Sequence, residues 1–227
     1  MHMVNLYYIR QGSGFPLILL HGNGEDSSYF SHQTEAFSAR FQTYAIDTRG
    51  HGRSPRGKAP FTLIQFAQDL KNFMDEHNIP KAHILGFSDG GNIAMLFAQM
   101  YPERVEKLIL NGANLDPQGV KPLVQLPIVL GYGLLSFISL FDKGAIPKKE
   151  LLCLMVTQPH IKPHQLSSLH IPTLVVAGDR DMIKDSHTRL IAESIPDAQL
   201  CILPGSHFVA AENPKAFNRA VLEFLEQ

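Results

Sequence analysis

Gly86-Phe87-Ser88-Asp89-Gly90 carries the strongest structural signal in this chain. It follows a short apolar run, Ala82–Leu85, and precedes a helix-like stretch, Asn92–Ala98. This pattern predicts a strand, a tight turn and a helix, with Ser88 at the apex of the turn. Glycine on both sides of the serine suits such a turn because the strand and the helix pass too close for a Cβ. The turn places the serine and the next backbone N–H at a positive helix N-terminus. We therefore interpret Ser88 as a nucleophile rather than a plain helix N-cap.

Short apolar runs that favour strands alternate with segments of helical periodicity along most of the chain. This alternation predicts a doubly wound, mostly parallel α/β sheet with helices on both faces. The predicted strands are Asn5–Ile9, Leu17–Leu20, Thr43–Asp47, Ala82–Phe87, Val105–Leu110, Thr173–Ala177 and Gln199–Leu203. The predicted helices are Tyr29–Ala39, Leu63–His77, Gly91–Met100, Ser186–Ser194 and Lys215–Leu225.

The alternation stops between Asn111 and Ile171, where prolines recur. An insertion of this length inside a compact domain is more often a lid or a binding element than a plain connection. We therefore expect a core of residues 4–111 and 172–227 and a small helical cap of residues 112–171, inserted before the sixth predicted strand. The expected cap helices are Lys121–Phe141 and Lys148–Thr157. The alternative is an irregular stretch packed on the edge of the sheet.

A serine hydroxyl is a weak nucleophile until a base takes its proton, and the base needs an acid that orients it. In a doubly wound sheet such groups lie on loops at the carboxyl ends of strands. Asp181 follows the predicted strand Thr173–Ala177, and His207 follows Gln199–Leu203. With Ser88 they give the chain order Ser, Asp, His that is typical of one hydrolase arrangement. We predict that all three are catalytic. The alternative acids are Asp179 and, more remotely, Asp185.

A fourth loop, His21-Gly22-Asn23-Gly24, follows the predicted strand Leu17–Leu20. A glycine-lined backbone in this place can offer an N–H to a developing oxyanion. We predict that the backbone N–H groups of Asn23 and Asp89 form the oxyanion hole. His21 is expected to hydrogen-bond backbone near this loop.

These pieces together resemble the α/β-hydrolase superfamily over nearly all of the chain. The matching motifs are HGNG at His21, DTRGHGRS at Asp47, GFSDGG at Gly86, GDRD at Gly178 and GSHFVAAENP at Gly205. The resemblance implies that the DTRGHGRS loop is structural and that the acid is the second aspartate of GDRD. It also implies that the histidine is followed by an E-x-P motif, as His207 is by Glu212-Asn213-Pro214. The elbow is similar to those of biphenyl-hydrolase-like and amino-acid-ester hydrolases.

Asp89 is the least generic residue of the elbow. One interpretation is a carboxylate favoured at a helix N-terminus, worth about 0.3–1 kcal/mol. The other is a charge that biases the pocket against anionic substrates or toward amines. The first is the simpler interpretation, and the sequence leaves both open.

Substrate specificity is expected to come from the apolar side chains of the cap. We predict an apolar pocket of modest size, lined by Leu126, Leu130, Leu134 and Phe137. The same region, Leu123–Phe141, is interrupted by Gln125, Pro127, Gly131 and Gly133. It is shorter than the roughly 20 residues that a membrane helix needs.

The composition excludes several classes of function. The chain has 227 residues, and 44% of them are hydrophobic. Its formal net charge is −1, which gives no electrostatic footprint for nucleic acid or an anionic membrane. The isolated cysteines Cys153 and Cys201, with no signal-peptide pattern, predict a cytoplasmic protein. His160 and His164 have helix-like spacing, but Pro159 and Pro163 argue against a regular helix there, so we expect no metal site. We expect no cofactor.

The expected function is that of a serine hydrolase acting on a small ester, thioester or activated amide. Hydrolysis of a carbon–carbon bond in a dienoic acid and a lyase reaction of the menaquinone pathway remain alternatives on the same fold. A receptor that binds a small molecule under its cap is a third alternative. The expected partner is an ester-like small molecule, and the expected state is a monomer or a homodimer.

Overall fold

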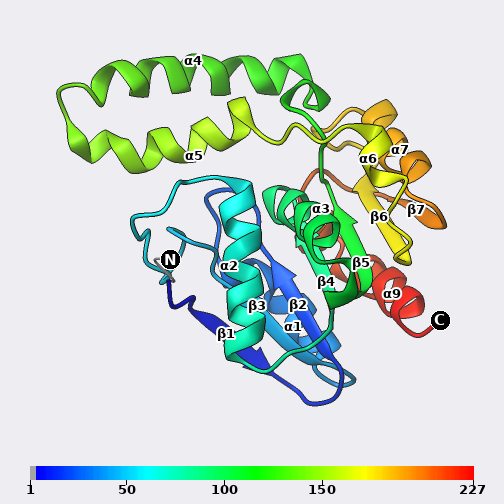
Figure 1. Cartoon of the computed structure of the whole chain (residues 1–227). Coiled ribbons are helices and arrows are strands. Elements are labelled where there is room, and N and C mark those ends of the chain that lie inside the picture. The colour runs from blue at the N-terminus through cyan, green and yellow to red at the C-terminus, as the bar shows by residue number, and fades with distance from the viewer. Residues whose placement is uncertain (1–3) are drawn as a thin grey trace.

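The computed structural model describes residues 4–227 and contains a central sheet of seven strands (Figure 1). The strand order is β1-β3-β2-β4-β5-β6-β7, and only β1 runs antiparallel to its neighbour. This arrangement confirms the predicted doubly wound, mostly parallel sheet. The strands are β1 Tyr8–Gln11, β2 Pro16–Leu20, β3 Gln42–Ile46, β4 Ala82–Phe87, β5 Val105–Asn111, β6 Thr173–Gly178 and β7 Ala198–Leu203.

Helices cover both faces of the sheet. The helices of residues 4–227, including two that project from the sheet, are α1 Ser31–Phe37, α2 Leu63–Glu76, α3 Asp89–Met100, α4 Pro122–Ile138, α5 Ile146–Thr157, α6 Pro163–Leu166, α7 Asp185–Ser194, α8 Val209–Glu212 and α9 Pro214–Leu225. Alternate residues of β2 face opposite sides: Ile18 joins the apolar cluster under α2, α3 and α7, whereas Leu17 joins the one under α1 and α9. This alternation follows from the two-residue period of a strand. Each face of the sheet is thereby buried under its own layer.

The first strand begins later than the sequence predicts. Tyr7 donates its N–H to the Ser54 hydroxyl at 2.8 Å instead of to a neighbouring strand, and regular pairing runs from Tyr8 to Gln11. The predicted helix Tyr29–Ala39 is also divided, because a short 3-10 turn, Ser27–Phe30, precedes α1. The Asp26 side chain caps that turn by accepting from the Ser28 N–H at 2.8 Å. Neither change moves a loop that carries a predicted site residue.

Helices α4 and α5 form a hairpin that projects from the sheet (Figure 1). Of the two, α5 contacts the core through Leu154, which is buried in the cluster under α2 and α3. Helix α4 packs against α5 and has no buried residue. The two ends of the predicted cap segment pack into the core and do not project with the hairpin, because Leu115 and Leu166 belong to the core cluster. The projecting part is therefore narrower than residues 112–171.

No helix within residues 4–227 is both long enough and apolar enough to span a bilayer. Helix α4 has 17 residues and contains Pro127.

Candidate active site

The turn between β4 and α3 holds Ser88 in a strained conformation. Its φ and ψ are 53° and −119°, a region that non-glycine residues rarely occupy. Two hydrogen bonds fix the turn: the Ser88 N–H donates to Asn111 O at 2.8 Å, and Ser88 O accepts from the Asn92 N–H at 3.1 Å. A Cβ on Gly86 would collide with the backbone of Gly90, and one on Gly90 would collide with Leu20 O. The glycines are therefore a steric requirement of this turn.

Ser88, His207 and Asp181 form one line of hydrogen bonds. The Ser88 hydroxyl lies 3.0 Å from His207 Nε2, and His207 Nδ1 lies 2.7 Å from Asp181 Oδ1. Asp181 and His207 are buried, whereas Ser88 is partly exposed. The Ile183 N–H donates to the same Asp181 oxygen at 2.9 Å. A carboxylate in this place can orient the imidazole and stabilise its protonated form.

The other acidic residues near His207 order its loop. Asp179 Oδ1 accepts from the Gly205 N–H at 3.0 Å and does not face the imidazole. Glu212 accepts from the Ser206 N–H at 2.7 Å and from its hydroxyl at 2.6 Å. The geometry therefore favours Asp181 over Asp179 as the partner of the histidine.

Two backbone N–H groups near Ser88 are free to bind an oxyanion. Among residues 4–227, neither the Asn23 N–H nor the Asp89 N–H has a hydrogen-bond acceptor. The neighbouring Gly22 N–H is occupied, since it donates to Glu25 Oε2 at 3.2 Å. Asp89 opens helix α3, so its N–H also lies at the positive end of that helix. Both groups have the character that an oxyanion hole needs.

The Asp89 carboxylate does not point freely into solvent. It is 9% exposed, and its two oxygens accept from the side-chain amides of Asn23 at 2.9 Å and Asn92 at 3.2 Å. Asn92 in turn donates to Asn114 Oδ1 at 3.0 Å. Burial raises the pKa of Asp89, while the two amides oppose that rise. The Asp89 carboxyl group is thus held by a fixed network of side-chain amides.

The loop of Asn23 is held by a buried histidine. His21 Nδ1 donates to Gly22 O at 2.7 Å, and His21 Nε2 accepts from the Thr48 N–H at 3.0 Å. Burial, followed by the nearby His51, lowers the pKa of His21 to about 4. Burial also raises the pKa of Glu25 to about 6. His21 is therefore neutral at pH 7, which these two hydrogen bonds require.

The four predicted pocket residues are largely exposed. Leu126, Leu130, Leu134 and Phe137 are on α4, and each is more than half exposed. Their pocket role stays a prediction. His160 pairs with Asp116 at 2.9 Å, and the part of the chain described here holds no group of three metal-ligating side chains.

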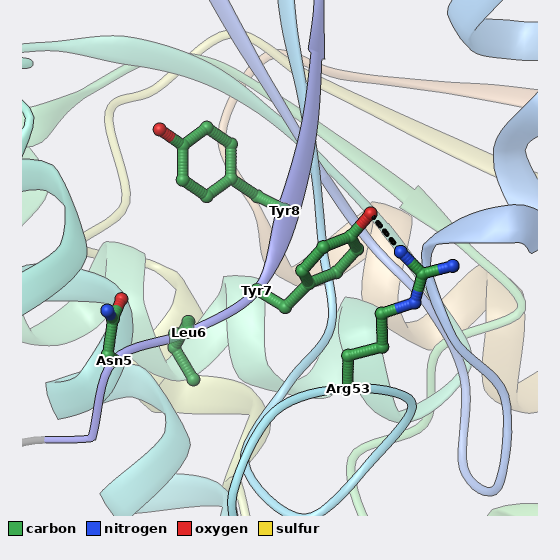
Figure 2. Close-up of a pocket in the computed structure, with 5 residues that line it drawn as sticks. All are labelled: Asn5, Leu6, Tyr7, Tyr8 and Arg53. Carbon is green, nitrogen blue, oxygen red and sulfur yellow. Dashed lines mark hydrogen bonds between the residues drawn. The ribbon is translucent and has the colours of Figure 1, made fainter.

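A separate cavity of about 440 Å³ lies beside β1 (Figure 2). Arg53 lies over the Tyr7 ring, 4.6 Å from its centre, and donates to the Tyr7 hydroxyl at 2.7 Å. The other lining residues are Asn5, Leu6 and Tyr8. None of these belongs to the predicted site.

The family model described as the alpha/beta hydrolase fold matches residues 16–133. The chain belongs to the α/β-hydrolase family. This α/β-hydrolase is 29% identical to a provisionally named carbamate hydrolase, RutD, of Azorhizobium caulinodans, over 97% of this chain and 94% of that one. It is 30% identical to the 2-hydroxy-6-oxononadienedioate/2-hydroxy-6-oxononatrienedioate hydrolase of Comamonas testosteroni, over 94% and 88%. A solved esterase from a marine microorganism superposes with a TM-score of 0.76 at 27% identity, over 97% of this chain and 99% of that one.

Several residues of this α/β-hydrolase site are not apparent from the sequence. Glu25 lies three residues after Gly22, and this spacing is the one local signal for its contact with the loop of residues 21–24. The partner of Asn23 in the cap, Leu151, is 128 residues away. Asn92 and Asn114 are single asparagines without a motif. Such contacts depend on tertiary packing, which periodicity does not encode.

Proposed function

We propose that this α/β-hydrolase is a serine hydrolase that cleaves a small carboxylic ester, thioester or activated amide. The observation that carries the proposal is the continuous hydrogen-bond line Ser88–His207–Asp181, at 3.0 and 2.7 Å, with Ser88 at a strained apex. This geometry satisfies the requirement that nucleophile, base and orienting acid be within hydrogen-bond reach.

In the proposed reaction, His207 Nε2 takes the Ser88 proton as the oxygen attacks the acyl carbon. The charge that develops on the carbonyl oxygen is stabilised by the N–H groups of Asn23 and Asp89. His207 then gives its proton to the leaving group, and an ester of Ser88 remains. Water, deprotonated by His207, attacks this ester; the Ser88 oxygen leaves, takes the proton back from His207, and the acid is released. Asp181 stabilises the imidazolium in both half-reactions.

The test is hydrolysis of p-nitrophenyl acetate by wild type and by Ser88→Ala. We expect the variant to lose all activity above buffer, because the remaining groups contain no nucleophile in this line. A series of acyl chain lengths, followed by amino-acid esters and thioesters, then defines the substrate class. Turnover by Ser88→Ala at the wild-type rate would contradict the proposal.

Hydrolysis of a carbon–carbon bond is the second candidate, because the Comamonas testosteroni relative is named for a dienedioate. Glu25, whose pKa burial raises to about 6, accepts from the Gly22 N–H in the loop of residues 21–24, and its ionised form disfavours a dianionic substrate there. We therefore expect faster turnover of neutral esters than of dienedioates. Loss of dienoate absorbance at a higher kcat/KM than that of any ester would reverse this order.

A further inference from the structure

The side chain of Asn23 connects three parts of the molecule. Its amide nitrogen donates to Asp89 Oδ2 at 2.9 Å and to Leu151 O at 3.0 Å. Asp89 opens helix α3 directly after Ser88, and Leu151 lies within cap helix α5. A primary amide has two N–H donors, so both are occupied. The nucleophile turn, the oxyanion loop and the cap therefore meet at one side chain.

Both ends of this bridge carry a candidate oxyanion donor. Within residues 4–227, the backbone N–H groups of Asn23 and Asp89 have no hydrogen-bond acceptor, and the side chains of the same two residues hydrogen-bond each other. This bond therefore directly links the two residues that carry the donors. Asp89 is fixed from the other side by Asn92, which is itself held by Asn114.

Because Leu151 belongs to α5, the hydrogen bonds of Asn23 also depend on how α5 packs on the core. Glu150, the preceding residue of α5, accepts two hydrogen bonds from the Arg56 guanidinium, at 2.8 and 2.5 Å. At the end of α5, Gln158 Oε1 accepts from the Leu63 N–H at 2.9 Å. Glu150 is next to the Asn23 contact, whereas the Gln158 contact lies one residue beyond the end of the helix. Substitution of Glu150 therefore removes a cap-to-core contact next to Asn23, and substitution of Gln158 removes one at a distance from Asn23.

We propose that Asn23, through its side chain, is a positioning residue that fixes the spacing of the two oxyanion donors and couples it to the docking of cap helix α5. This inference rests on the proposed serine hydrolase mechanism, since it assumes that the two N–H groups bind an oxyanion. It concerns the Asn23 amide, whereas the mechanism needs only the Asn23 backbone. Substitution of the side chain therefore leaves the donor N–H itself in place.

The first experiment compares Asn23→Ala with wild type on a p-nitrophenyl ester and an alkyl boronic acid, which forms a tetrahedral adduct on serine. Displacement of one donor is expected to lower kcat about 10- to 100-fold, because misplacement of about 1 Å can cost that much. KM should change less than about 3-fold, since the interaction strengthens only in the transition state. Boronic acid affinity should fall in proportion to kcat. Unchanged kcat and boronic acid affinity would overturn the proposal.

The second experiment tests the coupling to the cap. Glu150→Gln should lower kcat about 3-fold in wild type but by less than about 1.5-fold in Asn23→Ala, because coupled changes are not additive. Gln158→Ala breaks a cap-to-core bond that does not touch Asn23, and it should leave kcat within about 2-fold of wild type. Equal losses in Gln158→Ala and Asn23→Ala, or full additivity with Glu150→Gln, would assign Asn23 a merely structural role.

A fluorophosphonate probe separates this inference from the proposed function. If wild type is not labelled at Ser88, both the mechanism and the inference are wrong. If wild type and Asn23→Ala are both labelled to completion while kcat is equal in the two, only the inference fails. Melting temperatures of all variants show whether a loss of activity reflects unfolding.

Discussion

Asp89 is the residue whose role the sequence leaves open, and its surroundings disfavour a free charge that binds a substrate amine. The carboxylate is almost fully buried, and its two oxygens accept from Asn23 and Asn92. A substrate amine would have to compete with both amides for this charge. The Asp89 side chain therefore joins the loop of residues 21–24 to the turn that holds Ser88.

Asp181→Asn is expected to lower kcat about 10³- to 10⁴-fold, because an amide in this place favours the wrong tautomer of the histidine. Asp179→Asn is the matched control, since Asp179 contacts the Gly205 N–H and not the imidazole. We expect the control to stay within about 10-fold of wild type. Steady-state kinetics on one ester measure both variants. A larger loss in Asp179→Asn than in Asp181→Asn would reverse the assignment of the acid.

At the scale of the elements, the strand–turn–helix unit around Ser88 depends on close backbone contact. Gly90→Ala should reduce the free energy of unfolding by about 3 kcal/mol, because its Cβ would collide with Leu20 O. Gly133→Ala is the control, since a Cβ there has no neighbour within 4 Å. Gly133 lies within α4, and alanine should raise the free energy of unfolding by about 0.5–1 kcal/mol. Urea denaturation measures both free energies of unfolding. Similar changes in the two variants would contradict a steric requirement for glycine at position 90.

The two cap helices should differ in their contribution to stability. Leu154 of α5 is 1% exposed and packs in the core, so Leu154→Ala should cost about 2–4 kcal/mol of unfolding free energy. Leu130 of α4 is 64% exposed, so Leu130→Ala should stay within about 0.5 kcal/mol. A cost above about 2 kcal/mol for Leu130→Ala would indicate that α4 is covered by other parts of the molecule in solution.

The elements themselves were largely predictable from periodicity, because buried parallel strands such as β4 and β6 are continuous apolar runs. The boundaries of β1 were not, since the Tyr7–Ser54 contact replaces ladder pairing. Ser88, Asp181 and His207 could be found because each follows a strand within a motif. The side-chain bridge from Asn23 to Asp89 and Leu151 could not, because it depends on how the cap settles on the core.

At the scale of the whole molecule, the parallel sheet places the carboxyl ends of β4, β6 and β7 at one edge. Ser88, Asp181 and His207 follow these three strands, and so residues 119 positions apart come within 3.0 Å. The order of the three residues along the chain does not determine how close their side chains lie. It is the topology that joins them.

Stability should fall as the pH decreases from about 6.5 to 4. Burial lowers the pKa of His21 to about 4, so in this window the unfolded chain binds a proton that the folded chain excludes. Between pH 7.5 and 5, His21 alone should remove about 2 kcal/mol of unfolding free energy. The pKa of His83, also lowered to about 4 by burial, acts in the same direction. The pKa of Glu25, raised to about 6 by burial, acts in the opposite direction.

Urea denaturation at several pH values measures this effect. A His21 imidazole that takes up its proton near pH 6.5 in the folded protein, followed by NMR, would contradict its neutral buried state.

The most direct test of Ser88 as the nucleophile is the site at which a fluorophosphonate reacts. A triad of this geometry activates one serine above all others, so the adduct mass should map to the peptide that contains Ser88, with one adduct per chain. Ser88→Ala should carry none. An adduct on a different residue, or equal labelling of the Ser88→Ala variant, would show that Ser88 is not the nucleophile.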